Sequence, residues 1–559
     1  MNGDTTISSN HLFKPFRKNR VLIYLIPSAF GALVWMAAMG DIFIDDAFIT
    51  FSNARTFASG HGLYLEPGNR SESASSLPWA LLLSIFANTD FFLPFVPKLL
   101  GFVFYVGSLL LLIKYTIHVF DPVESESNEY NIPILKTVCI CIVLCASFGI
   151  WSFYGMENPL VCFLLHWTLC AFTSVEKTRP TVFNQVSVVV PLSLLYISRP
   201  ETFGFVIIFA LWDIVISIAR NGLLHAAKRW FGVLCIVGIY ELIGFIYYGN
   251  WLPTTAMAKT GVYPLTALIK NGSRYLFWST HLFATGILIF GAATGILYIG
   301  YPVRTSVKKN DAHHLPARLF SETASSMKQR HFLLLVLLLL GEIVFITFSG
   351  GDWMPIGRLA SHFMPLSVLV LVVGAHEFQK RIHFKLLTPF RYRVVLGLFI
   401  FSQVVALYVW WPRIQTLFKA DNHVLEGIAD RLNQCPDADS SVLAVSDIGR
   451  LSWRFRGQIF DWWGLADVAV TQRKESLGRI RPETVLQRKP DFIVLYSNHS
   501  TLSQSATKTG MAKTSAPFLM NDQFAALYHP IFSLKYASER WHVVFEKSTR
   551  PKCEIYGKH

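Results

Sequence analysis

Long apolar segments alternate with short polar loops along most of the chain. Most of these segments approach the roughly 20 residues that a helix needs to cross the hydrocarbon core of a bilayer. The pattern therefore predicts a polytopic α-helical membrane protein with about eleven spans in residues 1–412. The predicted spans centre on residues 21–40, 95–118, 133–153, 158–174, 181–197, 202–218, 230–248, 276–300, 331–349, 361–377 and 394–411.

The first apolar segment, 21–40, follows a cluster of basic residues and resembles the core of a signal peptide. Its end, Met36–Gly40, contains the small residues typical of a cleavage site. Signal-peptide cores run to only about 7–15 residues, however, and this segment is longer. We therefore expect an uncleaved membrane anchor.

Two stretches of the long loop after this segment are helical in pattern but do not read as spans. They cover residues 46–59 and 78–86. The second is apolar and short, and such short runs lie in the membrane interface more often than they cross it. A crossing here would also reverse the placement of every later basic loop. We expect both to be helices in the plane of the membrane surface, outside the cell.

The chain loses its membrane character after residue 412. Residues 413–559 mix short apolar runs with charges, as a soluble α/β domain does. An odd number of preceding spans places this domain outside the cytoplasm. The elements expected in it are helices at 414–434 and 483–488 and strands at 442–445, 492–495 and 541–545.

The formal net charge is +14, yet only 15% of the residues are charged. A soluble protein carries about 25%. The basic residues gather in alternate loops: the N-terminus and the regions near 177–179, 220–229, 304–330 and 380–393. This is the distribution that the positive-inside rule assigns to cytoplasmic loops. We expect contact with anionic membrane lipids. No DNA- or RNA-binding motif is present, so nucleic acid is not an expected partner.

Six of the eight cysteines lie inside apolar segments, where buried thiols are the expected state. The other two, Cys435 and Cys553, lie near the ends of the C-terminal domain. Because that domain is predicted to face an oxidising compartment, we expect them to form a disulfide. The alternative is two unrelated thiols. No cysteine spacing predicts a metal site.

A pair of aspartates, Asp45 and Asp46, directly follows the first predicted span. Neighbouring like charges and partial desolvation raise a carboxyl pKa. A carboxylate tuned in this way serves as a general base. The structural alternative is that Asp46 caps a helix beginning at Ala47.

With the predicted topology, the polar segments that interrupt the apolar pattern all fall on the outer side. Convergence of carboxylates and cations on one end of a helical bundle indicates a site at the membrane surface. The external cations beside spans are Arg199, Lys259 and Arg358, which suit phosphate. Each of the three has an alternative role as an interfacial anchor.

An ordered set of motifs between about 41 and 500 resembles the mycobacterial terminal β-1,2-arabinofuranosyltransferases, members of the wider GT-C glycosyltransferase group. Asn158 and the Ser75–Ser76 stretch depart from that pattern. The motifs are Asp45–Phe51, Gly60–Leu63, Glu66–Gly68, Gly155–Pro159, Ser198–Glu201, Leu252–Thr255 with Lys259, Gly350–Pro355 with Arg358, Ser446–Gly449 and Asp461–Asp467.

The resemblance implies transfer of a sugar, most simply arabinofuranose, from a polyprenyl-phosphate donor, with inversion, in a bacterial cell membrane. Asp46 would be the base and Asp45 its electrostatic partner or a ligand of the donor sugar. Glu157 and Glu201 would orient sugar hydroxyls or stabilise the bundle, and Asp352 would contact the furanose ring. The acceptor stays open between a cell-surface glycan and a pilin-like protein. A monophosphate donor has little need of a metal, so no metal or other cofactor is expected.

Two other functions fit parts of the pattern. A transporter or flippase for a lipid-linked sugar would use similar cations. Transporters usually show internal repeats and broken helices near the membrane midplane, however, whereas this chain keeps its charges at one end. A scaffold subunit without activity would not need the aspartate pair. Substituting Asp46 separates these classes, since transport tolerates an amide better than proton transfer does.

Overall fold

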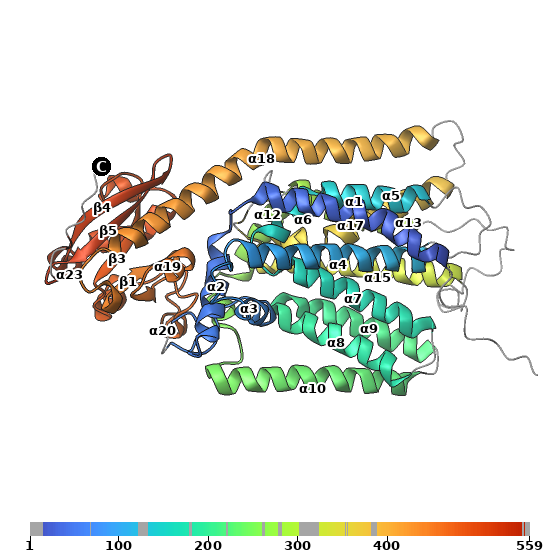
Figure 1. Ribbon diagram of the computed structural model, residues 1–559, viewed down its shortest axis with the longest axis horizontal. Coiled ribbons are helices and arrows are strands. Elements are labelled where there is room, and N and C mark those ends of the chain that lie inside the picture. The colour runs from blue at the N-terminus through green and yellow to red at the C-terminus, as the bar shows by residue number, and fades with distance from the viewer. Residues whose placement is uncertain are drawn as a thin grey trace, which may run out of the picture.

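The molecule consists of a bundle of long helices and a sheet-containing domain beyond one end of it (Figure 1). The computed structural model describes residues 15–66, 69–120, 132–177, 181–219, 222–259, 263–277, 282–300, 324–352, 354, 356–381, 388–550 and 553. Parts of two basic stretches expected in the cytoplasm, 304–330 and 380–393, fall in the gaps 301–323 and 382–387, and the N-terminal stretch 1–14 also lies outside these residues.

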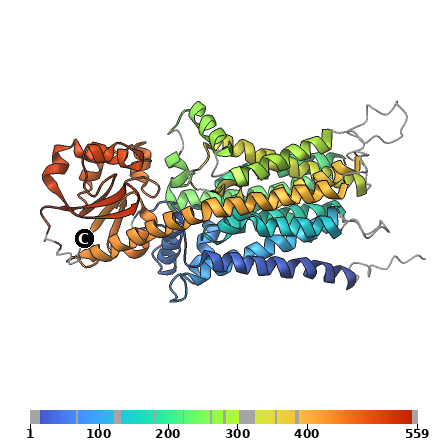
Figure 2. The ribbon, with the colours of Figure 1, turned by 90° about the horizontal axis from the view of Figure 1, so that it is seen from above.

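Most of the predicted spans form helices that run side by side in the bundle (Figures 1 and 2). They are α1 (Pro15–Met39), α4 (Phe95–Phe120), α5 (Ile132–Leu144), α6 (Ala146–Phe153), α7 (Asn158–Lys177), α8 (Val182–Ser198), α9 (Phe203–Ala219), α10 (Leu223–Tyr248), α13 (Leu282–Gly300), α15 (Ala324–Ser349) and α17 (Met364–Arg381). A further helix, α12 (Leu265–Phe277), was not predicted as a span.

Within the described residues, six helices are long and apolar enough to cross a membrane. The pair α5 and α6, bent by 54°, makes a seventh if it counts as one span. Shorter apolar helices lie in α8, α13, α17 and the later α18. The chain is thus a multi-pass membrane protein, while the predicted number of about eleven spans is not confirmed.

Large apolar side chains cover the outside of the bundle as well as its core. Almost none of α10 is buried inside the protein, and its Phe231 and Ile246 are 70% and 72% exposed. A soluble protein does not expose so continuous an apolar surface. Lipid tails are the surroundings that satisfy it.

The first long loop forms two short helices at the end of the bundle that faces the C-terminal domain. They are α2 (Asp45–Ala58) and α3 (Leu77–Ser84), close to the two ranges expected. In α3, the Ser76 hydroxyl caps the first turn by accepting from the Trp79 N–H. Figure 1 shows α2 lying across the bundle end, between the bundle and the domain. The alternative role of Asp46 as a cap is wrong, because α2 begins at Asp45 and its N-cap residue is Ile44.

One long helix, α18 (Thr388–Leu432), connects the two parts of the molecule. Its first half is apolar, and its second half carries charges and packs in the C-terminal domain (Figure 2). The predicted domain boundary at 412/413 lies inside this helix, where Pro412 interrupts the backbone hydrogen-bond pattern without ending it.

The C-terminal domain is built on a five-stranded mixed sheet in the order β2-β1-β3-β5-β4. β1 pairs in parallel with β2 and β3, and β5 pairs antiparallel with β3 and β4. The strands are β1 (Val442–Val445), β2 (Gln458–Asp461), β3 (Phe492–Ser497), β4 (Tyr528–Ala537) and β5 (Arg540–Lys547). Every residue of the central β3 is buried, which explains its continuous apolar run.

Short helices surround this sheet. They are α19 (Ile448–Arg454), α20 (Val468–Gln472), α21 (Pro482–Gln487), α22 (Ala516–Leu519) and α23 (Asp522–Leu527), with the 3₁₀ turns η5 (Ala438–Ser440), η6 (Ser505–Thr507) and η7 (Gly510–Ser515). The three predicted strands and both predicted helices are present, whereas β2 and β4 were not predicted.

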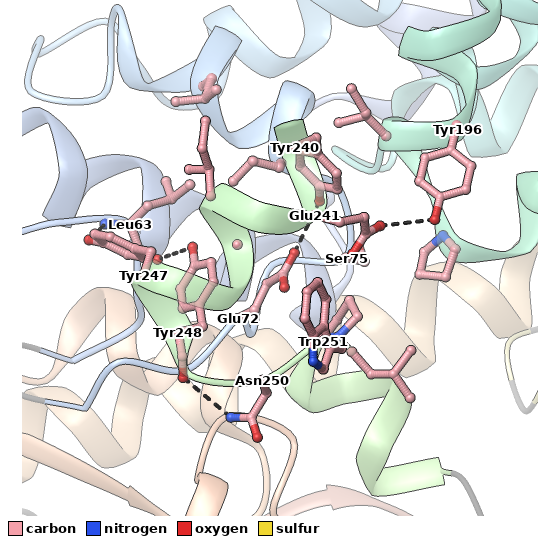
Figure 3. Close-up of a pocket in the computed structure, with 18 of the residues that line it drawn as sticks. Leu63, Glu72, Ser75, Tyr196, Tyr240, Glu241, Tyr247, Tyr248, Asn250 and Trp251 are labelled. Carbon is pink, nitrogen blue, oxygen red and sulfur yellow. Dashed lines mark hydrogen bonds between the residues drawn. The ribbon is translucent and has the colours of Figure 1, made fainter. Parts of the chain in front are cut away.

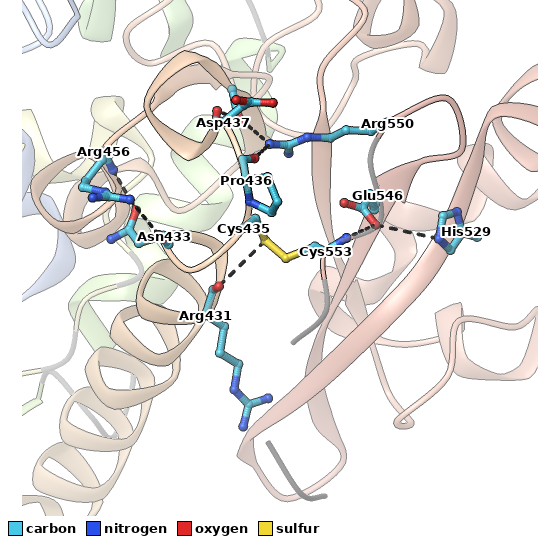
Figure 4. The surroundings of a disulfide bond; sticks show 11 residues. Arg431, Asn433, Cys435, Pro436, Asp437, Arg456, His529, Glu546, Arg550 and Cys553 are labelled. Atoms are coloured by element: carbon cyan, nitrogen blue, oxygen red, sulfur yellow. Dashed lines mark hydrogen bonds and ion pairs between the residues drawn. A yellow bond between two sulfur atoms is a disulfide. The ribbon is translucent and has the colours of Figure 1, made fainter. Parts of the chain in front are cut away.

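Cys435 and Cys553 form a disulfide across 118 residues, with their Cα atoms 4.9 Å apart (Figure 4). This confirms the pairing expected from the sequence. The bond joins the end of α18 to the segment after β5. Arg550 strengthens the same junction, because its guanidinium donates to the backbone oxygen of Pro436 and to the hydroxyl of Ser441, each at 2.6 Å.

Candidate functional site

The two aspartates at the start of α2 serve different neighbours. The Asp45 carboxylate accepts hydrogen bonds from the backbone N–H groups of Gly449 (3.1 Å) and Arg450 (2.6 Å), at the start of α19. These donors are otherwise unpaired at a helix start, and a carboxylate is their most favourable acceptor. Asp45 therefore fixes the C-terminal domain to the bundle end.

Only glycine fits at position 449. A Cβ atom there would lie 1.9 Å from the backbone oxygen of Asp45, well inside van der Waals contact. The motif Ser446–Gly449 thus has a structural role, which is to let α19 approach α2. The contact continues along α2, where the Arg55 guanidinium lies 4.1 Å from the centroid of the Trp453 ring.

Asp46 faces the bundle instead. Its Oδ2 lies 3.9 Å from Nη1 of Arg358, which begins the short helix α16 (Arg358–Ser361). Arg358 is buried, and its Nε pairs with Oδ2 of Asp352 at 2.6 Å. The side chain of Asp46 remains 34% exposed, so it is the accessible member of this charged group.

The surroundings of Asp46 raise its pKa above the usual 3.8. Burial of the carboxyl group is the leading cause, and the carboxylates of Asp352 and Glu157 act in the same direction. The cations Arg358 and Lys259 oppose the change. The expected direction is present, but desolvation contributes more than neighbouring negative charge.

Lys259 ends α11 (Thr254–Lys259) and is exposed, close enough for its charge to act on Asp46. The loop that carries Asp352 packs closely against Tyr275 of α12. Gly351 has φ +73°, and a Cβ there would lie 2.5 Å from Cβ of Tyr275. Trp353 and Pro355 of the same motif lie outside the described residues.

Arg199 belongs to a second, largely buried group of charges. Its Nη1 pairs with Oε1 of Glu157 at 2.6 Å, and its Nε pairs with Glu201 in the 3₁₀ turn η2 (Pro200–Thr202). Ser75 donates to the same Glu157 oxygen at 3.1 Å. With its charge balanced by two carboxylates, Arg199 fixes the acidic side chains in place.

The two groups are joined through Asn158. Its amide donates to the backbone oxygen of Arg358 (3.1 Å) and to the hydroxyl of Ser361 (2.8 Å). Asn158 follows Glu157 directly, so the pair of residues connects the Arg199 group to the Arg358 group. The structure thus brings the motifs around 45, 157, 199, 259, 352 and 358 to one end of the bundle.

The motif Asp461–Asp467 lies in the C-terminal domain and has a local structural role. The Asp461 carboxylate accepts from the backbone N–H groups of Trp463 (2.9 Å), Gly464 (3.0 Å) and Ala466 (2.6 Å). These bonds shape the loop after β2. Among the described residues, no group of three or more His, Cys, Asp or Glu side chains is arranged to hold a metal ion.

Sequence reasoning missed a buried acid inside the bundle. Glu342 in α15 is fully buried, and neither of its carboxyl oxygens has a hydrogen-bond partner among the described residues. An ionisable residue in the middle of an apolar segment is itself a signal.

A cavity of about 500 Å³ beside the charged groups was also not predicted from the sequence (Figure 3). Glu72 accepts from the Tyr240 hydroxyl at 3.3 Å, and Glu241 accepts from Tyr196 at 2.9 Å. Burial raises the pKa of Glu72 to about 7, the Tyr240 hydrogen bond opposes this rise, and Glu241 adds to it. Glu241 lies inside an apolar segment, which again was the available signal.

The fold is similar to that of a solved membrane protein, ArnT from Cupriavidus metallidurans bound to undecaprenyl phosphate. The TM-score is 0.52 at 9% identity, with 97% of this chain and 100% of that chain covered. This likeness shows that the chain has the GT-C fold, as the motifs predicted.

Two oligosaccharyltransferase structures from Archaeoglobus fulgidus are also similar, one of AglB with an inhibitory peptide and a dolichol-phosphate and one with zinc and sulfate. Their TM-scores are 0.48 and 0.49 at 12% and 13% identity. They cover 86% and 84% of this chain and 70% and 67% of their own chains.

Sequence comparison assigns only the C-terminal part. Residues 417–556 match a family described as a domain of unknown function, DUF8728. No curated protein matches the chain. The specific likeness to arabinofuranosyltransferases is therefore not confirmed by these comparisons.

Proposed function

We propose that the protein is a membrane glycosyltransferase that moves a sugar from a polyprenyl monophosphate to an acceptor hydroxyl, with inversion. The observation that carries the proposal is Asp46: an accessible carboxylate with a raised pKa, facing Arg358, at the loop end of a bundle with the GT-C fold. ArnT, which shares this fold, was solved with undecaprenyl phosphate.

The proposed reaction uses three charged side chains, Asp46, Lys259 and Arg358, in distinct roles. The acceptor oxygen attacks the anomeric carbon from the face opposite the phosphate, and a new C–O bond forms there. The bond from that carbon to the phosphate oxygen breaks, and its electron pair leaves with the phosphate. Asp46 takes the proton of the acceptor hydroxyl. The reaction as written includes no metal ion.

Lys259 and Arg358 hold the phosphate and stabilise its growing charge. Arg358 offers a planar fork kept in place by Asp352, whereas Lys259 offers an exposed point charge. Arg199 acts indirectly, because its ion pairs orient Glu157 and Glu201. The sugar side of the site is formed by three acids held by these arginines: Asp352, Glu157 and Glu201.

The sugar proposed from the sequence resemblance is arabinofuranose, and the acceptor is a cell-surface glycan or a pilin-like protein. The site and the C-terminal domain face the outside of a bacterial inner membrane. Lys228 and Arg330, which lie near the opposite ends of α10 and α15, support this orientation. The Cys435–Cys553 disulfide supports it too, since such bonds persist in oxidising compartments.

The test is donor choice by the purified full-length protein in lipid nanodiscs. We expect release of polyprenyl phosphate from radiolabelled polyprenyl-phosphate arabinofuranose, and roughly 10²–10⁴-fold slower release with Asp46→Asn. A nucleotide-linked sugar is offered in parallel. Turnover of the nucleotide sugar alone would refute the proposal.

A further inference from the structure

The charged side chains that line the cavity beside the charged groups are all acidic. Two carboxylates, Glu72 and Glu241, face it, and among the described residues that line it there is no lysine or arginine. Most of the remaining wall is apolar or aromatic, including Trp251 and four tyrosines, and Ser75 and Asn250 add neutral polar groups (Figure 3). Its volume of about 500 Å³ lies within the range of small-molecule sites.

The carboxylates are held in place from the protein side. Tyr240 donates to Oε1 of Glu72, and Tyr196 donates to Oε1 of Glu241. The tyrosines come from α10 and α8, and Glu72 comes from the loop before α3. A carboxylate accepts several hydrogen bonds. An occupant with hydroxyl groups therefore finds fixed acceptors on two sides.

The rim of the cavity is apolar and open. Phe203, Ile243 and Trp251 are 54%, 60% and 59% exposed, and all three line the cavity. One face of the Trp251 ring stacks on Phe245, with ring centroids 4.4 Å apart. Since α10 is exposed along nearly its whole length, this rim meets the lipid.

The inner wall reaches the catalytic group. Ser75 lines the cavity and donates to Glu157, which is the partner of Arg199 and one of the charges acting on Asp46. Pro200, next to Arg199, lines it as well. The cavity thus leads from the lipid side toward Asp46.

We propose that this cavity binds the acceptor as an uncharged, hydroxyl-bearing sugar carried on an apolar chain. Glu72 and Glu241 accept hydrogen bonds from its hydroxyls, and the apolar chain leaves over the rim into the lipid. This inference rests on the proposed function, because it names the acceptor of that reaction.

The charge of the lining favours the neutral acceptor over the phosphate-bearing donor as the occupant of this cavity. A phosphate placed between two carboxylates with no cation would meet repulsion in a partly dehydrated site. The donor phosphate instead has Lys259 and Arg358, which act on Asp46 and are not among the residues that line the cavity. A bare apolar chain would not need two acids held by tyrosines. The cavity therefore suits the neutral partner of the reaction.

Photolabelling of the full-length protein in nanodiscs tests this without requiring turnover. One probe is decyl arabinofuranoside with a diazirine in the chain, and the other is decaprenyl phosphate with the same group. We expect the glycoside to label peptides from α8, α10 and residues 72–81. Replacing both acids, Glu72→Gln with Glu241→Gln, removes the charge of the acceptors and should reduce this labelling about tenfold.

Glu539→Gln, an exposed acid between β4 and β5, is the matched control and should leave the labelling unchanged. Tyr196→Phe provides a second variant that keeps both acids but loosens one, with an intermediate loss expected. The proposal is overturned if the double variant labels as well as the natural protein, or if the phosphate probe marks these peptides as strongly as the glycoside. Glycoside labelling in a protein that turns over no lipid-linked sugar would leave this site standing and refute the proposed function.

Discussion

The carboxylate of Asp45 binds the backbone N–H of Gly449, 404 residues further along the chain. The next residue, Asp46, points to Arg358 in the bundle. The two adjacent acids thus have different neighbours: Asp45 binds the C-terminal domain, and Asp46 faces the bundle. Because both begin the same helix, the seating of the C-terminal domain fixes the position of Asp46.

Asp46→Asn should reduce transfer by roughly 10²–10⁴-fold, because an amide does not accept the acceptor proton. The fold should persist, since Asp46 is partly exposed and its nearest cation is 3.9 Å away. The rate of polyprenyl-phosphate release and the melting temperature measure the two effects. Asp45→Asn is the matched comparison, and it should lower the melting temperature more and the rate less. Equal rates in Asp46→Asn and the natural protein would remove the assignment.

Gly449→Ala should loosen the domain from the bundle. The added methyl group would overlap the backbone oxygen of Asp45, and relieving such overpacking costs about 1–3 kcal/mol. Limited proteolysis in the connection near α18 should become faster, with a lower transfer rate because α2 shifts. Gly204→Ala is the control, since a Cβ there meets nothing within 4 Å. Identical proteolysis of both variants would show that α19 does not depend on this contact.

The sequence predicted those parts of the structure that follow from local pattern. The bundle helices and the strands β1, β3 and β5 come from apolar runs, which carry their own period and length. β2 and β4 were not predicted, because their own sequences lack a clear strand pattern. β2 begins with Gln458 and ends with Asp461, so it reads as a loop, and β4 is a half-exposed edge strand that contains Pro530.

The charged groups were predicted as residues but not as pairs. Position at the outer ends of spans marked Asp46, Arg199 and Arg358. That Arg199 is balanced by Glu157 and Glu201 depends on packing between α7, α8 and η2, which no sequence window contains. The contact between Asp45 and Gly449 has the same character, and so does the cavity formed by α8, α10 and the loop before α3.

The two proposed phosphate cations should differ in what they contribute. Lys259→Met should raise the donor KM about tenfold or more with a smaller change in kcat, because an exposed charge aids binding. Arg358→Lys should lower kcat as well, since it removes the planar fork that faces both Asp352 and Asp46. Lys270→Met on α12, an exposed lysine, is the control. Donor titrations at fixed acceptor measure both constants. An unchanged donor KM in both variants would exclude phosphate binding by these residues.

Reduction of the Cys435–Cys553 bond should destabilise the C-terminal domain. The bond closes a loop of 118 residues, and removing such a bond typically costs 2–5 kcal/mol in a small domain. Native protein should not alkylate at Cys435 or Cys553 until a reductant is added. Peptide mass spectrometry gives the answer for each cysteine. Labelling of both without reductant would argue against the disulfide and against an oxidising compartment.

The acid Glu72 should make stability depend on pH. Its pKa is about 7 in the folded protein and 4.5 without the fold, because burial disfavours the charged form. Below pH 4.5 both states keep the proton. Between 4.5 and 7 the unfolded state releases it first, so stability falls as the pH rises, and above 7 the full cost of burying the charge is present.

Glu72→Gln removes this cost, so its melting temperature should fall less between pH 5 and pH 8 than that of the natural protein. Glu539→Gln, which is exposed, should retain the natural slope and serves as the control. Differential scanning fluorimetry in nanodiscs at four pH values measures the slopes. Parallel curves for the natural protein and Glu72→Gln would mean that Glu72 is hydrated in the empty cavity. The carboxylate would then already be charged and ready to accept hydrogen bonds at pH 5.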